Sequence, residues 1–113
     1  MLKHRWVIGM ILSVFVSTIS LAVENKGAEN IQLDGGSRGA VPFTHRSHQD
    51  RLEDCNVCHT MFPQQSQSLA KLKETGQLKP KDVMNKLCVK CHKEEKKAGN
   101  NTGPITCSQC HIR

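Results

Sequence analysis

The stretch Cys88-Val89-Lys90-Cys91-His92 decides how this chain of 113 residues can fold, because its pattern recurs. The other two copies of Cys-x-x-Cys-His are Cys55-Asn56-Val57-Cys58-His59 and Cys107-Ser108-Gln109-Cys110-His111. Together the three copies use all 6 cysteines of the chain. A pattern that accounts for every cysteine, and always places a histidine directly after the second one, indicates one chemistry used three times.

This pattern is typical of covalent c-type haem attachment. Two thiols three residues apart can form thioether bonds with the vinyl groups on one edge of a porphyrin, and the histidine that follows reaches the iron as its proximal ligand. The sequence therefore predicts three c-type haems. Their attachment residues are Cys55, Cys58, Cys88, Cys91, Cys107 and Cys110, and their proximal ligands are His59, His92 and His111.

Two other uses of paired cysteines compete with haem. Cysteine pairs with histidines can bind zinc, and six cysteines in an exported chain can form a disulfide framework. A zinc site does not require a histidine directly after every second cysteine, and a disulfide framework requires no histidine at all. The repeated histidine therefore favours haem.

The first residues of the chain have the pattern of a secretory signal peptide. Lys3 and Arg5 supply its basic start, an apolar run follows, and Ser20-Leu21-Ala22 provides the small residues that a signal peptidase reads. We predict a signal peptide over residues 1–22, cleaved after Ala22, and a periplasmic domain over residues 23–113. An uncleaved membrane anchor is the alternative, because residues 6–23 carry no charge and reach the minimum of about 18 residues for a spanning helix.

The exported part is poor in the residues that build a hydrophobic core. It has no Trp or Tyr, and Leu, Ile, Val and Phe make up 16 of its 91 residues, below the roughly 20% that globular chains reach. Such a chain cannot bury enough apolar surface to offset its conformational entropy. We therefore predict a small multihaem cytochrome fold. In it, mainly short α-helices and irregular loops wrap round three haems, with a minimal N-terminal β element.

Charge argues against one class of partner. Removing Lys3 and Arg5 from the 16 basic side chains leaves 14, against 10 acidic ones. The propionates of three haems, together with the charges of three ferric irons, would bring the oxidised protein close to neutral. No aromatic residues are interleaved with basic ones, as single-strand binding needs. We therefore expect no nucleic-acid binding.

A second informative stretch, Val41-Pro42-Phe43-Thr44-His45-Arg46-Ser47-His48, precedes the first cysteine pair. Its first residues alternate as in a short strand, as do residues 31–33, and Thr44 can cap a short helix. On that helix His45 and His48 are three apart, so they share one side while fanning outward. We interpret them as distal ligands of two different irons rather than as solvated surface histidines.

The remaining segments carry less chemistry. Residues 24–39 are polar and show none, with a flexible glycine-rich end. Between the first two motifs we predict a helix over Ser66–Thr75 with Gly76 as its stop. After the break at Lys79-Pro80-Lys81, Asp82 is predicted to cap a second helix that carries the middle motif.

In residues 41–48 and the three cysteine motifs, the chain resembles the class III multihaem cytochromes c, and within them the small three-haem members. The family pattern Val-x-Phe-x-His-x-x-His, followed by the cysteine motifs, matches at Val41, Phe43, His45 and His48. The resemblance covers roughly residues 40–113. It implies that His45 closes the first haem, opposite the histidine of the first motif, and that His48 closes the haem of the middle motif. It also implies that the ring of Phe43 packs between haems.

The chain is one histidine short of two for each haem. Of its 6 histidines, His4 lies in the predicted signal peptide, so the third haem, bound by His111, lacks a histidine partner. In the family its distal ligand stands four residues before the first cysteine of the middle motif, and this chain has Met84 there. Methionine in place of histidine raises the reduction potential. Two alternatives remain open: a five-coordinate or water-bound iron, or ligation by Met61 or a lysine such as Lys86.

Haems closed by two protein ligands leave no position for a substrate and exchange electrons with little rearrangement. We therefore predict an electron carrier, not an enzyme, that acts as a monomer and meets other redox proteins by transient docking. The resemblance implies partners such as inner-membrane oxidoreductases, outer-membrane cytochromes and terminal reductases in anaerobic respiration. The alternative is a small-ligand sensor or reductase acting at the third haem, if its distal position is open. Five lysines could dock an acidic partner or form an ordinary solvated helix face: Lys86, Lys90, Lys93, Lys96 and Lys97.

Overall fold

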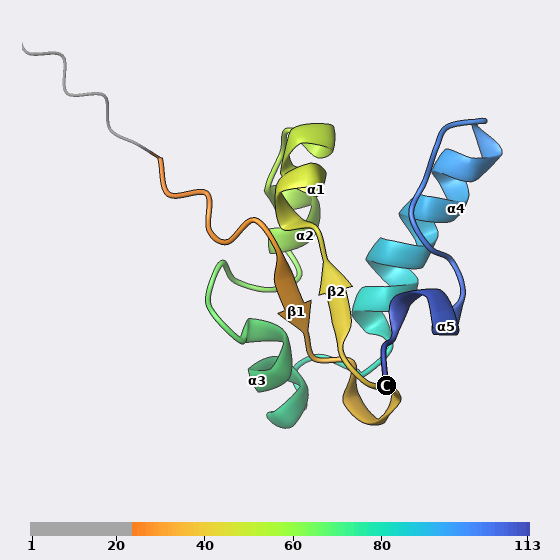
Figure 1. Ribbon diagram of the computed structural model, residues 1–113. Coiled ribbons are helices and arrows are strands. Elements are labelled where there is room, and N and C mark those ends of the chain that lie inside the picture. The colour runs from red at the N-terminus through yellow and green to blue at the C-terminus, as the bar shows by residue number, and fades with distance from the viewer. Residues whose placement is uncertain (1–23) are drawn as a thin grey trace, which may run out of the picture.

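The computed structural model describes residues 24–113 (Figure 1). The predicted signal peptide and its cleavage after Ala22 lie outside the described residues. Among the described residues, no helix is long and apolar enough to cross a membrane. The elements in chain order are β1 (Ile31–Leu33), the 3-10 turn η1 (Gly36–Arg38), β2 (Val41–Phe43), α1 (His45–Leu52), α2 (Asn56–His59), α3 (Ser68–Glu74), the π-helical stretch η2 (Met84–Cys88), α4 (Val89–Lys97) and α5 (Cys107–Cys110).

The two short strands form one antiparallel sheet between the helices (Figure 1). Ile31 pairs with Phe43 and Leu33 pairs with Val41. These four side chains are half-buried, whereas the residues between them are exposed, as the two-residue period of a strand requires. The alternation that predicted short strands here is therefore confirmed.

The helix α1 begins after Thr44, as predicted, but the threonine side chain makes no capping hydrogen bond. Its backbone carbonyl is used instead. That carbonyl accepts the amide of His48 at 3.3 Å and lies 2.8 Å from Nδ1 of the same residue. Thr44 thus fixes both the first turn of α1 and the ring of a predicted ligand.

Glycines end α3 and α4 by the same motif. Gly76 has φ +71 and Gly99 has φ +81, a left-handed conformation that costs glycine little. Their amides donate to the carbonyls of Lys73 and Lys96, both at 3.1 Å, and so satisfy the open ends of the helices. The prediction of Gly76 as a stop is confirmed, although α3 begins at Ser68 rather than at Ser66.

The prediction that Asp82 caps the second helix is wrong. The amide of Asn85 donates to the carbonyl of Lys81 at 2.9 Å, so the first turn already contains Asp82. Helical structure then runs through η2 into α4. The carboxylate of Asp82 forms an ion pair with Lys86 at 3.3 Å, one turn later. An acidic side chain in the first turn still interacts favourably with the helix dipole.

The described polypeptide has almost no hydrophobic core of its own. Within residues 24–113, the only buried apolar side chains are Leu69 and Leu78, which are 9% and 6% exposed, and Ser68 is the only buried polar one. All five histidines of this part, and four of its six cysteines, are half-buried. Histidines, cysteines and most apolar side chains are thus covered only in part by the polypeptide, which fits the prediction that porphyrins supply the core.

We predict that the haem-free polypeptide does not fold cooperatively. Protein made without haem attachment, and kept reduced to prevent disulfides, should show no cooperative thermal transition by circular dichroism, because so little apolar surface is buried. The exported holoprotein is the control and should unfold in a defined transition. A cooperative transition in the haem-free chain would contradict this account of the core.

Candidate haem-binding sites

Every histidine among the described residues holds its ring by the same kind of contact. Nδ1 lies within hydrogen-bond distance of a backbone carbonyl in each case. The pairs are His45 with Ala28 at 3.0 Å, His48 with Thr44 at 2.8 Å, His59 with Phe62 at 3.1 Å, His92 with Pro104 at 2.7 Å, and His111 with Gly39 at 3.0 Å. A carbonyl oxygen can only accept, so Nδ1 carries the proton and Nε2 keeps the lone pair. Each neutral ring therefore presents Nε2 to a metal.

Four of these rings lie in two pairs. The ring centres of His45 and His59 are 6.3 Å apart, and those of His48 and His92 are 6.2 Å apart. A metal–imidazole bond of about 2.0 Å, with the ring centre about 1.1 Å behind the nitrogen, gives about 6.2 Å for two imidazoles on opposite sides of one iron. The separations therefore fit a haem iron between the rings of each pair. These are the pairs that the family resemblance implies.

The two pairs share one helix. His45 and His48 both lie on α1, whereas His59 ends α2 and His92 lies in α4. Phe43, the last residue of β2, stacks on His48 with ring centres 4.3 Å apart, and its ring centre is 6.0 Å from that of His45. An aromatic ring beside both predicted distal ligands is the arrangement expected of a side chain packed between two haems.

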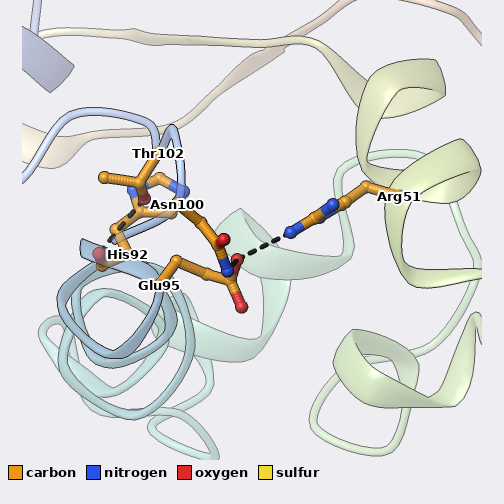
Figure 2. Close-up of polar contacts among 5 residues, drawn as sticks. All are labelled: Arg51, His92, Glu95, Asn100 and Thr102. Carbon is orange, nitrogen blue, oxygen red and sulfur yellow. Dashed lines mark hydrogen bonds and ion pairs between the residues drawn. The ribbon is translucent and has the colours of Figure 1, made fainter. Parts of the chain in front are cut away.

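One ion pair joins α1 to α4, and two hydrogen bonds tie α4 to the segment that follows it (Figure 2). Nη2 of Arg51 lies 2.8 Å from Oε2 of Glu95, and Asn100 donates to the same oxygen at 3.0 Å. Thr102 donates to the carbonyl of His92 at 3.1 Å. The hydrogen bond from Arg51, followed by that from Asn100, lowers the pKa of the Glu95 carboxyl. The ion pair between Arg51 and Glu95 thus connects the helix that carries the predicted distal histidines with the helix of the middle motif.

The third histidine site is different. Within residues 24–113, no second histidine ring faces His111 as in the two pairs. Met84, its predicted partner, is half-buried and begins η2. A π turn holds one residue more than an α turn and often occurs at functional sites, so it changes the direction of Met84 relative to the motif that follows. The pairing of Met84 with His111 stays a prediction that rests on its spacing from Cys88.

The two other predicted candidates for this iron differ in their surroundings. Met61 follows α2 and is half-buried. Lys86 is exposed, and its ammonium group is paired with Asp82 at 3.3 Å. A lysine already held by a carboxylate is a poorer ligand than a half-buried thioether, so these contacts favour a methionine.

Two glycines, which sequence reasoning missed, let the backbone approach the rings closely. A Cβ atom at Gly103 would lie 2.5 Å from the His92 ring, and one at Gly35 would lie 2.6 Å from Nδ1 of His111. Either would push the ring away from its hydrogen bond. No sequence motif marks these glycines, because the rings that they meet come from distant segments.

The cysteines of the three motifs differ in burial: Cys55 and Cys107 are exposed, and the other four are half-buried. Burial raises the pKa of the Cys58, Cys88 and Cys110 thiols, and cysteines of neighbouring motifs add to the shifts at Cys58 and Cys88. In the described part of the chain all six are free of disulfides, and no three histidine, cysteine or acidic side chains gather as a zinc site requires. All six thiols of the described residues are therefore unpaired and available for attachment.

Sequence comparisons show which known proteins this chain is similar to. The model of the Class III cytochrome C family matches residues 20–111. Cytochrome c7 of Geobacter metallireducens is 30% identical over 107 residues, which cover 95% of this chain and 96% of that protein. The 26 kDa cytochrome c3 of Desulfomicrobium norvegicum is 26% identical over 92 residues, covering 67% of this chain and 80% of that protein.

Solved structures agree with the sequence relatives. The triheme cytochrome PpcA from Geobacter sulfurreducens is similar with a TM-score of 0.53 and 29% identity, covering 76% of this chain and 100% of its own. PpcC, a cytochrome c7 from the same organism, has a TM-score of 0.52 and 29% identity, with 76% and 99% covered. The predicted small multihaem fold is thereby confirmed. The chain belongs to the class III cytochrome c family and, like its triheme members, binds three c-type haems with their irons.

Proposed function

We propose that this protein is a periplasmic electron carrier with two bis-histidine haems and a third haem bound by His111 and Met84. Membership of the class III family implies electron transfer through several haems. The observation that carries the finer assignment is the separation of the ring centres, 6.3 Å for His45 and His59 and 6.2 Å for His48 and His92.

The chain's own part in this function is to hold the ligands still. Each bound haem supplies a one-electron redox centre, while the Nδ1 hydrogen bonds keep the imidazoles in one orientation. Because those acceptors are backbone carbonyls, they keep the same protonation state when the charge of the iron changes. Two fixed ligands per iron also leave no position for a substrate, which suits transfer rather than catalysis.

The proposed ligand difference would divide the haems into two classes. His45, His48, His59 and His92 would give two haems with the low potentials of bis-histidine ligation, whereas a thioether from Met84 would raise the potential of the third. The support for Met84 is its spacing from Cys88 and its half-buried position at the start of η2. An electron entering the protein would then settle preferentially on the third haem.

Partners of this carrier are proposed to be other redox proteins that dock transiently. Small, short-lived contacts are typical of electron-transfer encounters. Five lysines on η2 and α4 are exposed and could meet an acidic surface: Lys86, Lys90, Lys93, Lys96 and Lys97. The signal-peptide pattern at the start of the chain supports a periplasmic location.

The absence of a sixth histidine from residues 23–113 is the one observation that favours a second function. An iron held only by His111 would bind small molecules such as carbon monoxide or nitric oxide, and the protein would act as a sensor or reductase. No acid–base cluster was identified in the sequence beside this site, so the carrier is the better-supported proposal.

A redox titration of the purified holoprotein, followed by visible and electron paramagnetic resonance (EPR) spectra, tests the carrier proposal. We expect three low-spin haems, two of them titrating at low potential and one distinctly higher. Carbon monoxide added to the reduced protein should leave the spectra unchanged. A complex of carbon monoxide with one haem per protein would instead support the sensor or reductase.

Substitution of Met84 tests the third ligand directly. Met84→Ala should abolish the weak methionine-to-iron band near the red edge of the oxidised spectrum and open one haem per protein to carbon monoxide. Met84→His should lower the potential of that haem towards the other two, because histidine replaces the thioether. Met61→Ala is the matched control and should change neither property. A resting high-spin signal that survives Met84→Ala unchanged would exclude Met84 as a ligand.

The two bis-histidine haems should differ in their EPR spectra. The planes of His45 and His59 cross at 84°, whereas those of His48 and His92 differ by 35°. Each ring donates π density to the iron d orbital perpendicular to its plane, so crossed rings leave two d orbitals nearly equal in energy and near-parallel rings separate them. We expect one strongly anisotropic low-spin signal and one rhombic signal. Two matching rhombic signals would contradict the ring geometry, whereas a high-spin signal from either haem would contradict the ligand pairs.

A further inference from the structure

The ring of His111 depends on a segment from the other end of the described chain. Its Nδ1 donates to the carbonyl of Gly39, 72 residues earlier, at 3.0 Å. The amide of Ile112 donates to the carbonyl of Ala40 at 2.8 Å in the same place. The other four histidines use carbonyls between 3 and 17 residues away. The third haem site is therefore the one whose proximal ligand is held by the most distant segment.

This segment, residues Asp34–Gly39, is called here the Asp34 loop, and it packs tightly against the residues that it holds. A Cβ atom at Gly35 would lie 2.6 Å from Nδ1 of His111 and would overlap the carbonyl of Gly39. A Cβ atom at Gly39 would overlap the carbonyl of Ile112. Because the backbone of the Asp34 loop lies against the His111 ring and against the backbone of Ile112, the loop cannot shift without moving His111.

Asp34 and Lys73 fix the conformation of the loop. Oδ1 of Asp34 accepts the amide of Gly36 at 2.9 Å, which starts the turn, and the amide of Gly39 donates to the carbonyl of Gly36 at 3.1 Å. Nζ of Lys73 lies 2.6 Å from Oδ2 of Asp34 and donates to the Asp34 carbonyl at 2.9 Å. The hydrogen bond from Lys73 lowers the pKa of the Asp34 carboxyl.

Lys73 is placed to act as a fixed support. Its side chain is only 17% exposed, so it is less free to move than a typical surface lysine. It lies on α3, the helix that also carries the buried residues Ser68 and Leu69. Figure 1 shows α3 beside the end of β1 and the C-terminus beside the loop that follows β1. Contacts thus run without interruption from α3, through Lys73 and Asp34, to the carbonyl that orients His111.

We propose that Lys73 and Asp34 are positioning residues for the third haem, acting through the carbonyl of Gly39 on the ring of His111. The hydrogen bond to Nδ1 makes the imidazole a stronger donor. A stronger donor stabilises ferric iron over ferrous iron and so lowers the reduction potential. Because the third haem has no histidine on its other side, its potential responds most to this one ring. The proposal rests on the proposed function in taking His111 as the proximal ligand of a haem that has no second histidine.

The test compares Lys73→Met with Lys71→Met in the full-length holoprotein. Lys71 lies on the same helix but is exposed, so its replacement removes the same charge without releasing the Asp34 loop. We expect Lys73→Met to raise the midpoint potential of the third haem and leave the other two unchanged. In the reduced protein, the Nδ1 proton of His111 should exchange with solvent several-fold faster by nuclear magnetic resonance. Lys71→Met should change neither property.

Further variants separate positioning from general loosening. Asp34→Asn keeps the size of the side chain and should reproduce the shift, and adding it to Lys73→Met should add little, because both act on one contact. Lys73→Arg should restore part of the wild-type potential. An unchanged third haem in Lys73→Met, or equal shifts of all three haems, would overturn the proposal. If the Lys73→Met variant does not incorporate its haems, the midpoint potential of the third haem in Asp34→Asn tests the proposal by the same criteria.

Failure of this proposal is distinguishable from failure of the ligand assignment. If Met84 is not a ligand, the wild-type spectra reveal it before any variant is made. The role of Lys73 is read from the difference between Lys73→Met and Lys71→Met, which does not depend on the distal ligand. The exchange rate of the His111 proton is likewise a property of the proximal side alone.

Discussion

The structure depends on one repeated contact, in which a histidine Nδ1 donates to a backbone carbonyl. It occurs at His45, His48, His59, His92 and His111. The contact settles the tautomer, leaves Nε2 for metal and fixes the ring plane in a single step. It also ties the haem sites to the path of the main chain, because three of the five acceptors come from segments at least 12 residues away. The geometry of the histidine rings therefore depends directly on the path of the backbone.

Small apolar content and many haems are complementary features of this chain. With only Leu69 and Leu78 buried among the apolar side chains of residues 24–113, the polypeptide cannot hold its helices together by packing alone. Three covalently attached porphyrins supply the apolar surface that the side chains lack. The chain orients the predicted ligands through short helices and strands, glycine turns and carbonyl acceptors. The ion pair between Arg51 and Glu95 is exposed and contributes modestly. It links the two helices that carry His48 and His92, the proposed ligands of one iron.

Features set by neighbouring residues could be predicted from the sequence. The spacing of cysteines and histidines predicted the attachment motifs, and alternation predicted the short strands. Asp82 was assigned wrongly, because a carboxylate serves equally well as a cap or in the first turn, and the choice depended on the carbonyl of Lys81. The Asp34 loop was interpreted as flexible and without chemistry. Its role comes from contacts with Lys73 and His111, which are far away in sequence and leave no local pattern.

The placement of His45 and His48 on one helix has a consequence for the path of charge. In the proposed arrangement these two side chains bind different irons, so the covalent bridge between the first two redox centres is a single turn of α1 with Phe43 beside it. Tunnelling rates fall steeply with the length of the gap, and this gap is set by three consecutive peptide units. The rate of electron exchange between these centres therefore depends on the geometry of residues 45–48.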